Sequence, residues 1–193
     1  VLNGYIVKSE VVTSSHELKD YALIVNTDKD INGEQAKLLF ADGTTKVVTT
    51  DVKYDGTSNR ANVGDLVTYE VKKGEYVLTK AETSDADKAG FDKIVTGKYV
   101  NDSGKGKING ERIADDAVIF VKDNAGKFST MAGSDFAKYS TTSVVDKNIT
   151  AYANKDNSTG YNSIVLAYVE LNAKVNSITS NYGYVTSAVS TTK

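Results

Sequence analysis

Apolar and polar residues alternate along most of the chain with the two-residue period of half-buried β-strands. Val67, Tyr69 and Val71, for example, would lie on one face of a strand, whereas the residues between them are polar. Segments of this kind predict strands at 5–12, 21–26, 35–41, 45–50, 66–72 and 75–80. Short strands at this spacing are typical of a small barrel or sandwich.

Two hairpin turns are specified by local sequence. Asp42-Gly43 separates the strands at 35–41 and 45–50, and Lys73-Gly74 separates the last two strands of this group. Glycine supplies the positive φ that tight hairpin turns require. We therefore expect antiparallel pairing with a defined register at both places.

A polar segment at 83–90 lacks strand alternation and predicts a boundary between two domains, 1–83 and 84–172. In the second domain we expect strands at 94–100, 107–114, 117–122, 148–154 and 162–171. The last of these is apolar on both faces, which is typical of a central strand. Ser134 is expected to cap a short helix over 134–139. The predicted fold is all-β, with two small antiparallel barrel or sandwich domains in tandem and very little helix.

The segment 173–193 is either the start of a further β unit or the closing hairpin of the second domain. Residues 182–189 are similar to residues 3–11 when one gap is allowed, which favours a serial arrangement of units. The chain also begins without an initiator Met or a signal peptide. We expect it to be part of a longer polypeptide.

Composition and charge exclude several classes of function. The net charge of −2 arises from 23 basic and 25 acidic residues that are interspersed, so we expect no nucleic-acid partner. The segment 63–71 is similar to a strand of an oligonucleotide-binding barrel, but Arg60 and Arg112 are the only arginines available to such a face. The absence of Cys excludes disulfides, thiolate metal sites and thiol catalysis. No run of eighteen apolar residues predicts a membrane span.

Candidate catalytic residues are few. His16 is the only histidine, it lies in a polar connection, and no Gly-x-Ser-x-Gly motif accompanies it. Asp115 and Asp116 form the closest carboxylate pair, but neighbours on a strand point to opposite faces. We therefore predict that the protein is not an enzyme and assign no catalytic or cofactor-binding residue.

One segment matches the first half of a calcium loop, with Asp28, Asp30 and Asn32 at alternate positions before Gly33. The twelfth position is Leu39, which offers no bidentate carboxylate. The segment is therefore either a plain hairpin or a calcium site, and we assign no cofactor. Residues 154–160 have a similar composition and predict a turn.

Four segments carry a resemblance to a known class of proteins: 4–7, 36–44, 63–71 and 115–121. In these segments the chain resembles the repeated β regions that accompany S-layer homology modules in Gram-positive S-layer and cell-envelope proteins. The resemblance implies a secreted structural protein at the cell surface or cell wall, with a spacer, lattice or display role. Its partners would be other copies of the surface protein or a cell-wall polymer, bound through regions outside this chain. The alternative function is an adhesive or glycan-binding surface module.

Overall fold

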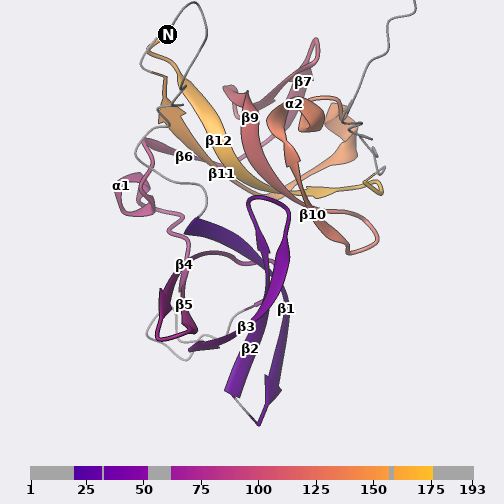
Figure 1. Cartoon of the computed structure of the whole chain (residues 1–193). Helices are drawn as coiled ribbons and strands as arrows, with labels where there is room; N and C mark the ends of the chain where they lie inside the picture. Colours follow the sequence, from indigo (N-terminus) through magenta and orange to yellow (C-terminus); the bar gives the residue numbers. More distant parts are fainter. Residues whose placement is uncertain (1–19, 32, 52–61, 157–158, 176–193) are drawn as a thin grey trace, which may run out of the picture.

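The computed structural model describes residues 20–31, 33–51, 62–156 and 159–175 (Figure 1). Its first unit is a closed barrel of five strands in the order β1-β2-β3-β5-β4, in which β4 returns to pair with β1. The strands are β1 (Tyr21–Asp30), β2 (Gly33–Phe40), β3 (Thr45–Asp51), β4 (Leu66–Lys72) and β5 (Glu75–Lys80). All five were expected from the alternation, and the strand expected at 5–12 lies outside the described residues.

One pair of neighbouring strands in the barrel is parallel, β3 with β5, where Thr50 lies opposite Tyr76. The other four pairings of the barrel are antiparallel. Closed five-stranded barrels, of which the OB-fold is an example, occur in proteins of many functions. The topology alone therefore does not indicate the function, which has to be inferred from the side chains.

Both predicted hairpin turns of the barrel are confirmed. Gly43 has φ 82°, and the Thr44 backbone N–H donates to Asp42 Oδ1 at 2.8 Å. At the second turn, Lys73 and Gly74 have φ 53° and 87°. Two successive residues with positive φ match the right-handed twist of the strands that they join.

The second unit is a curled sheet in the order β6-β11-β12-β9-β8-β7, with β10 paired to β9. As predicted, β12 is central, because it pairs with β11 antiparallel and with β9 parallel. The all-β class is confirmed. The strands are β6 (Lys93–Val95), β7 (Tyr99–Asp102), β8 (Lys105–Ile108), β9 (Glu111–Lys122), β10 (Phe128–Ala132), β11 (Val144–Lys155) and β12 (Asn162–Leu171).

Several strands of the second unit begin and end elsewhere than expected. The strand expected at 94–100 is divided into β6 and β7 around Gly97, which has φ 127°. Asn109 and Gly110, with φ 47° and 86°, form a hairpin turn that divides the strand expected at 107–114. An Asn-Gly pair is a strong local hairpin signal, and the strand assignment overlooked it. Strand β10 was not expected.

The helical elements of the structure include α1 (Ala86–Ala89), α2 (Gly133–Phe136) and the 3₁₀ turn η2 (Thr141–Ser143), all of them short. The expected capping role of Ser134 is wrong, because α2 begins at Gly133 and its N-cap is Ala132, without a side-chain hydrogen bond. In the described part of the chain, no helix reaches the length and apolar character needed to cross a membrane.

Each unit has its own apolar core. The barrel interior is filled by Ala22, Ile24, Ala36, Leu38, Val48, Val67 and Leu78. The curled sheet packs one face against α2, with Tyr99 and Phe136 among its largest fully buried side chains. The expected boundary at 83/84 falls between β5 and α1, and the independence of the domains 1–83 and 84–172 stays a prediction. Of the segment 173–193, the structure describes only residues 173–175.

Candidate functional site

The candidate calcium segment lies at the end of the hairpin formed by β1 and β2. Strands β1 and β2 pair up to Asp30 opposite Gly33, so Asp28 and Asp30 lie in extended backbone and not in a coiled metal-binding loop. Asp28 is exposed and accepts a hydrogen bond from the Lys29 backbone N–H at 2.8 Å. Within the described residues, no three His, Cys, Asp or Glu side chains are grouped to hold a metal ion. Asn32, like His16 and Arg60, lies outside the described residues.

Asp115 and Asp116 depart from the strict alternation that the sequence predicted. Ile113 pairs with Ile164, and Val118 pairs with Leu166, so residues 114–117 of β9 face the single residue Val165. A bulge of this kind re-aims the side chains of its strand. Both aspartates are exposed, and Asp115 Oδ1 lies 3.5 Å from the Arg112 guanidinium.

Of the segment at 154–160, which was predicted to be a turn, Asn154 and Lys155 are the last residues of β11, and Asp156, Thr159 and Gly160 belong to its connection to β12. The Asp156 backbone N–H donates to the carbonyl of Tyr161 at 2.9 Å, and the Gly160 N–H donates to the carbonyl of Asp156 at 2.7 Å. Gly160 has φ 74°. The turn and the β9 bulge line the same cleft, so the structure brings together Asp115 and Asp156, which the sequence analysis treated separately.

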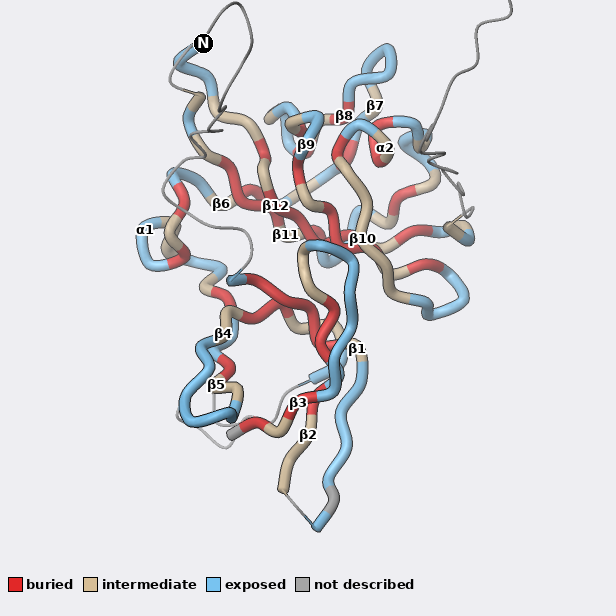
Figure 2. Tube along the Cα trace, viewed as in Figure 1, coloured by how far each residue is buried: buried red, intermediate tan, exposed pale blue. Residues whose placement is uncertain are grey.

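An apolar joint, which the sequence analysis did not predict, lies between the barrel and the sheet. Figure 2 shows buried positions on both sides of this junction. The barrel contributes Tyr21, Leu23, Leu39 and Leu66; the segment between the units contributes Ala81, Ala89 and Phe91; and the sheet contributes Phe120, Tyr152, Leu166 and Tyr168. We call these eleven residues the joint.

Strand β1 shows how the joint arises from the sequence. Its first residues are apolar on both faces: Ala22 and Ile24 belong to the barrel core, and Tyr21 and Leu23 belong to the joint. All four are less than 5% exposed. The continuous apolar run at 21–24 could have predicted the joint from sequence. A strand that is buried on both faces needs a second layer of structure outside the barrel.

Three aromatic rings lie at the centre of the joint. Phe91 lies 4.8 Å from Tyr152 and 5.5 Å from Tyr21, measured between ring centroids. Each phenol also holds the intervening segment: Tyr152 donates to the carbonyl of Glu82 at 3.0 Å, and Tyr21 donates to the carbonyl of Ala89. Each aromatic pair adds about 0.5–1.5 kcal/mol beyond the burial of its area. The segment 81–91 is thus fixed to both units.

Polar groups surround the joint at a cleft of about 370 Å³. The barrel side presents Lys80 and Asp65 at 3.1 Å, and the sheet side presents Lys122 and Glu170 at 3.7 Å. Tyr168 donates to Glu170 Oε1 at 3.0 Å. Ion pairs this exposed contribute about 0–1 kcal/mol each. The joint therefore depends mainly on its apolar contacts.

The turn between β2 and β3 makes a further contact across the two units, where it lies beside β10 (Figure 1). A Cβ atom at Gly43 would lie 2.9 Å from Thr130 Oγ1. Glycine at this position is therefore required both by its φ of 82° and by the close approach of β10.

The buried phenols make the protein sensitive to alkali. Burial raises the pKa of Tyr21 and of Tyr99 from 10.0 to about 12, and it also raises the pKa of Tyr152 and Tyr168. A pKa raised in the folded state favours the neutral phenol there, so the stabilisation is complete below the unfolded value and is lost as pH rises. We expect stability to fall steeply between pH 10 and 12.

Tyrosinate absorbance followed in parallel with circular dichroism measures this effect. The four buried phenols should ionise only together with unfolding, in the pH range where the circular dichroism signal is lost. Ionisation of all twelve tyrosines in one transition, with the fold intact, would contradict the burial of these rings.

Comparison with known proteins returned no relative. No protein-family model, no curated protein and no solved structure matches this chain. Its function is therefore inferred from its own residues.

Proposed function

We propose that this chain is a structural, non-catalytic part of an S-layer or cell-envelope surface protein of a Gram-positive bacterium. In this role it holds the regions on either side of it at a fixed distance and orientation. The observation that carries the proposal is the joint, because it fixes two β units to each other through a shared apolar core. Contacts with other copies or with a cell-wall polymer would be made through regions outside this chain.

The joint supports a spacer because units joined by a plain linker move relative to each other by default. An apolar interface that also buries Ala81, Ala89 and Phe91 of the connecting segment removes that freedom. Here Phe91 packs between two tyrosines from different units, and both phenols bind carbonyls of the segment that connects them. A rigid pair of units suits a lattice or a spacer, in which orientation must be transmitted along the chain.

Distance measurements between the units test the proposal. The chain has no Cys, so Lys37→Cys in β2 and Lys105→Cys in β8 introduce two unique sites for spin labels, both at exposed positions. We expect a single narrow distance distribution by pulsed electron paramagnetic resonance. A pair within the sheet, Lys105→Cys with Lys138→Cys, supplies the width expected for one rigid body. A distribution much broader than that control would overturn the spacer proposal.

The extracellular location is tested on intact cells of the producing organism. An antibody raised against the folded chain should label cells before lysis. Labelling that appears only after permeabilisation would contradict a surface location, whatever the rigidity of the joint.

We also propose that the fold needs no resident cofactor, calcium included. Asp28 lies in a paired strand, and the hairpin register is complete without an ion. We expect the same melting temperature in millimolar calcium and in a chelator, for the native chain and for Asp28→Ala alike. A ligand that binds only the folded state raises the melting temperature by mass action, so a calcium-dependent rise that is lost in Asp28→Ala would contradict this expectation.

The adhesive or glycan-binding alternative is favoured by a single feature, the cleft beside the turn between β11 and β12.

A further inference from the structure

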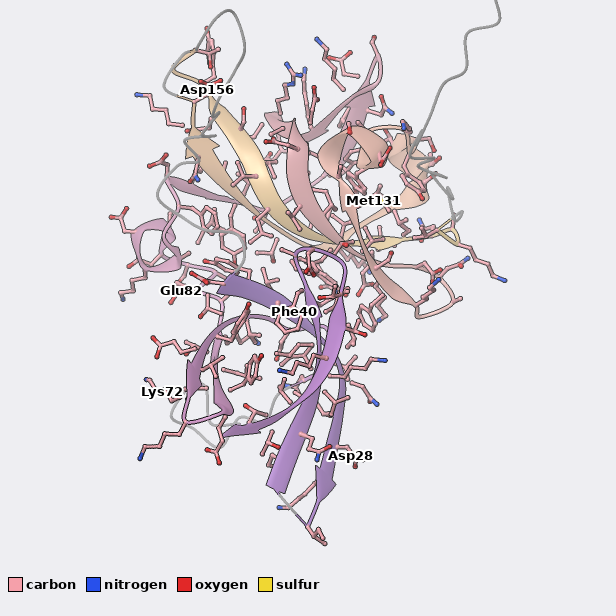
Figure 3. All side chains as sticks on the ribbon, viewed as in Figure 1. Asp28, Phe40, Lys72, Glu82, Met131 and Asp156 are labelled. Carbon is pink, nitrogen blue, oxygen red and sulfur yellow. The ribbon has the colours of Figure 1, made fainter. Side chains whose placement is uncertain are left out.

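A cleft of about 480 Å³ lies at the end of the sheet where β9 and β12 begin. Figure 3 shows Asp156 at this end, on the side of the sheet away from the barrel. Strand β9 and its bulge contribute Arg112 and Asp115, and the turn and the start of β12 contribute Asp156, Tyr161 and Asn162. A volume of this size lies within the range of about 300–1,000 Å³ that is usual for small-molecule sites.

The side chain of Tyr161 gives the cleft an open aromatic face. It is 78% exposed, and it is the only aromatic residue among the exposed large hydrophobic residues of the described chain. Its backbone is held by a hydrogen bond from Asp156 N–H to its carbonyl, and its N–H lies 3.4 Å from Thr159 Oγ1. The backbone of Tyr161 is therefore held in place, while its ring contributes little to either core.

The polar groups of the cleft are carried by a rigid part of the sheet. Arg112 of β9 lies opposite Ser163 of β12 in the parallel pair, one residue before Ile113 pairs with the fully buried Ile164. The bulge that follows turns Asp115 toward the guanidinium of Arg112. Binding groups on loops that are held by such a scaffold are common in ligand sites.

The charges that line the cleft limit the class of ligand. Arg112 is the cationic residue of the lining, against the acidic side chains of Glu111, Asp115 and Asp156, and Glu111 is paired with Lys93. Three carboxylates beside one guanidinium give the lining a negative net charge, which disfavours phosphates and other anions. Because the lining also has a guanidinium and the amide of Asn162, it offers donors as well as acceptors. Hydroxyl groups, which donate and accept, satisfy such a lining better than ammonium groups, which only donate.

We infer that this cleft binds a neutral saccharide. The Tyr161 ring packs against the C–H face of one sugar ring, since the electron-rich face of an aromatic ring attracts the weakly positive hydrogens there. Arg112 donates to sugar oxygens, Asp115 accepts from a sugar hydroxyl, and Asn162 does both. This inference does not rest on the spacer proposal, because the cleft lies within the sheet unit.

Tryptophan fluorescence tests the aromatic contact directly. The chain has no Trp, so Tyr161→Trp introduces a single tryptophan and keeps an aromatic ring at position 161. Cellobiose, maltose and N,N′-diacetylchitobiose are titrated separately. We expect a saturable blue shift with at least one of them. Ile31→Trp, at a fully exposed residue in the turn between β1 and β2, is the matched control and should show no saturable change.

Variants without the introduced Trp distinguish the contribution of ring stacking to binding from that of hydrogen bonding. With the disaccharide that binds best, isothermal titration of Tyr161→Phe should match the native chain, and Tyr161→Ser should show no binding. Arg112→Met should weaken binding about tenfold, because a charged hydrogen bond is lost. Lys107→Met is its control, since Lys107 forms a similarly exposed ion pair with Asp102 outside the cleft. Thermal unfolding checks that each variant is folded.

Three results would overturn the inference. The first is that none of the three disaccharides binds to the native chain. The second is that Tyr161→Ser binds as well as the native chain, which would place the sugar elsewhere. The third is that oligolysine binds at Tyr161 and Asp115 while the disaccharides do not, which would identify the cleft as a site for a cationic peptide. None of these outcomes affects the distance measurements across the joint.

Discussion

Replacing Tyr152 by alanine is expected to lower the free energy of unfolding by about 3–5 kcal/mol, the usual cost of removing a large buried aromatic side chain. Tyr152 is fully buried, its ring contacts Phe91 and Tyr21, and its hydroxyl binds the segment between the units. The cavity opens between the barrel and the sheet, so the variant should also loosen their relative orientation. Urea unfolding measures the first effect, and the width of the spin-label distance distribution measures the second.

Tyr99→Ala is the matched control for this prediction. Tyr99 is also fully buried, packs 4.9 Å from Phe136 and donates to the carbonyl of Tyr139, but it belongs to the core of the sheet. The Tyr99→Ala variant should lose a similar free energy of unfolding, while the distribution of distances between the units stays narrow. Tyr152→Phe should cost only about 1 kcal/mol, for one hydrogen bond. An unchanged distribution in Tyr152→Ala would show that the joint does not depend on this ring.

Replacing Gly133 by alanine is expected to destabilise the sheet unit by about 1–3 kcal/mol or more, in the manner of an overpacked core. A Cβ atom at this position would lie 2.0 Å from the carbonyl oxygen of Ala114 and 2.8 Å from Ile113 Cγ2. The first of these is a backbone atom in the β9 bulge, which cannot rotate away. Alanine is favoured over glycine inside a helix by about 1 kcal/mol, but this gain is smaller than the cost of the clash.

Ser134→Ala provides the comparison at the next residue of α2. Ser134 is exposed and is not the N-cap, so its replacement should change stability by no more than about 0.5 kcal/mol. Thermal unfolding of the two variants under the same conditions measures the difference. If Gly133→Ala were as stable as Ser134→Ala, the close packing of α2 on β9 would be wrong.

Local sequence was sufficient where one short-range rule determined the structure. Strands β4, β5 and β12 have the predicted bounds, because alternation or an unbroken apolar run ends at clear turn residues. The turns at Gly43 and Gly74 also follow from local chemistry. The same rules applied to Asn109-Gly110 would have separated β8 from β9, so that error came from overlooking a local signal.

The residues of the candidate saccharide cleft were only partly accessible from sequence. Asp115 and the turn after β11 attracted attention as separate features, each with an ordinary explanation. Arg112 and Tyr161 could not be assigned to them, because the parallel pairing of β12 with β9 brings together segments about fifty residues apart. No periodicity within either segment indicates which distant strand lies beside it.

The sequence by itself determined the all-β class, most of the strands and several turns of this protein, because these depend on side-chain alternation and on the backbone preferences of a few neighbouring residues. The tertiary structure alone decided the two parallel strand pairings, the bulges and the joint. These arise when faces made by distant strands are buried together, as when Tyr21, Phe91 and Tyr152 meet between the barrel and the sheet. Burial of apolar area is non-directional, so the chain shows which residues must be covered but not which residues cover them.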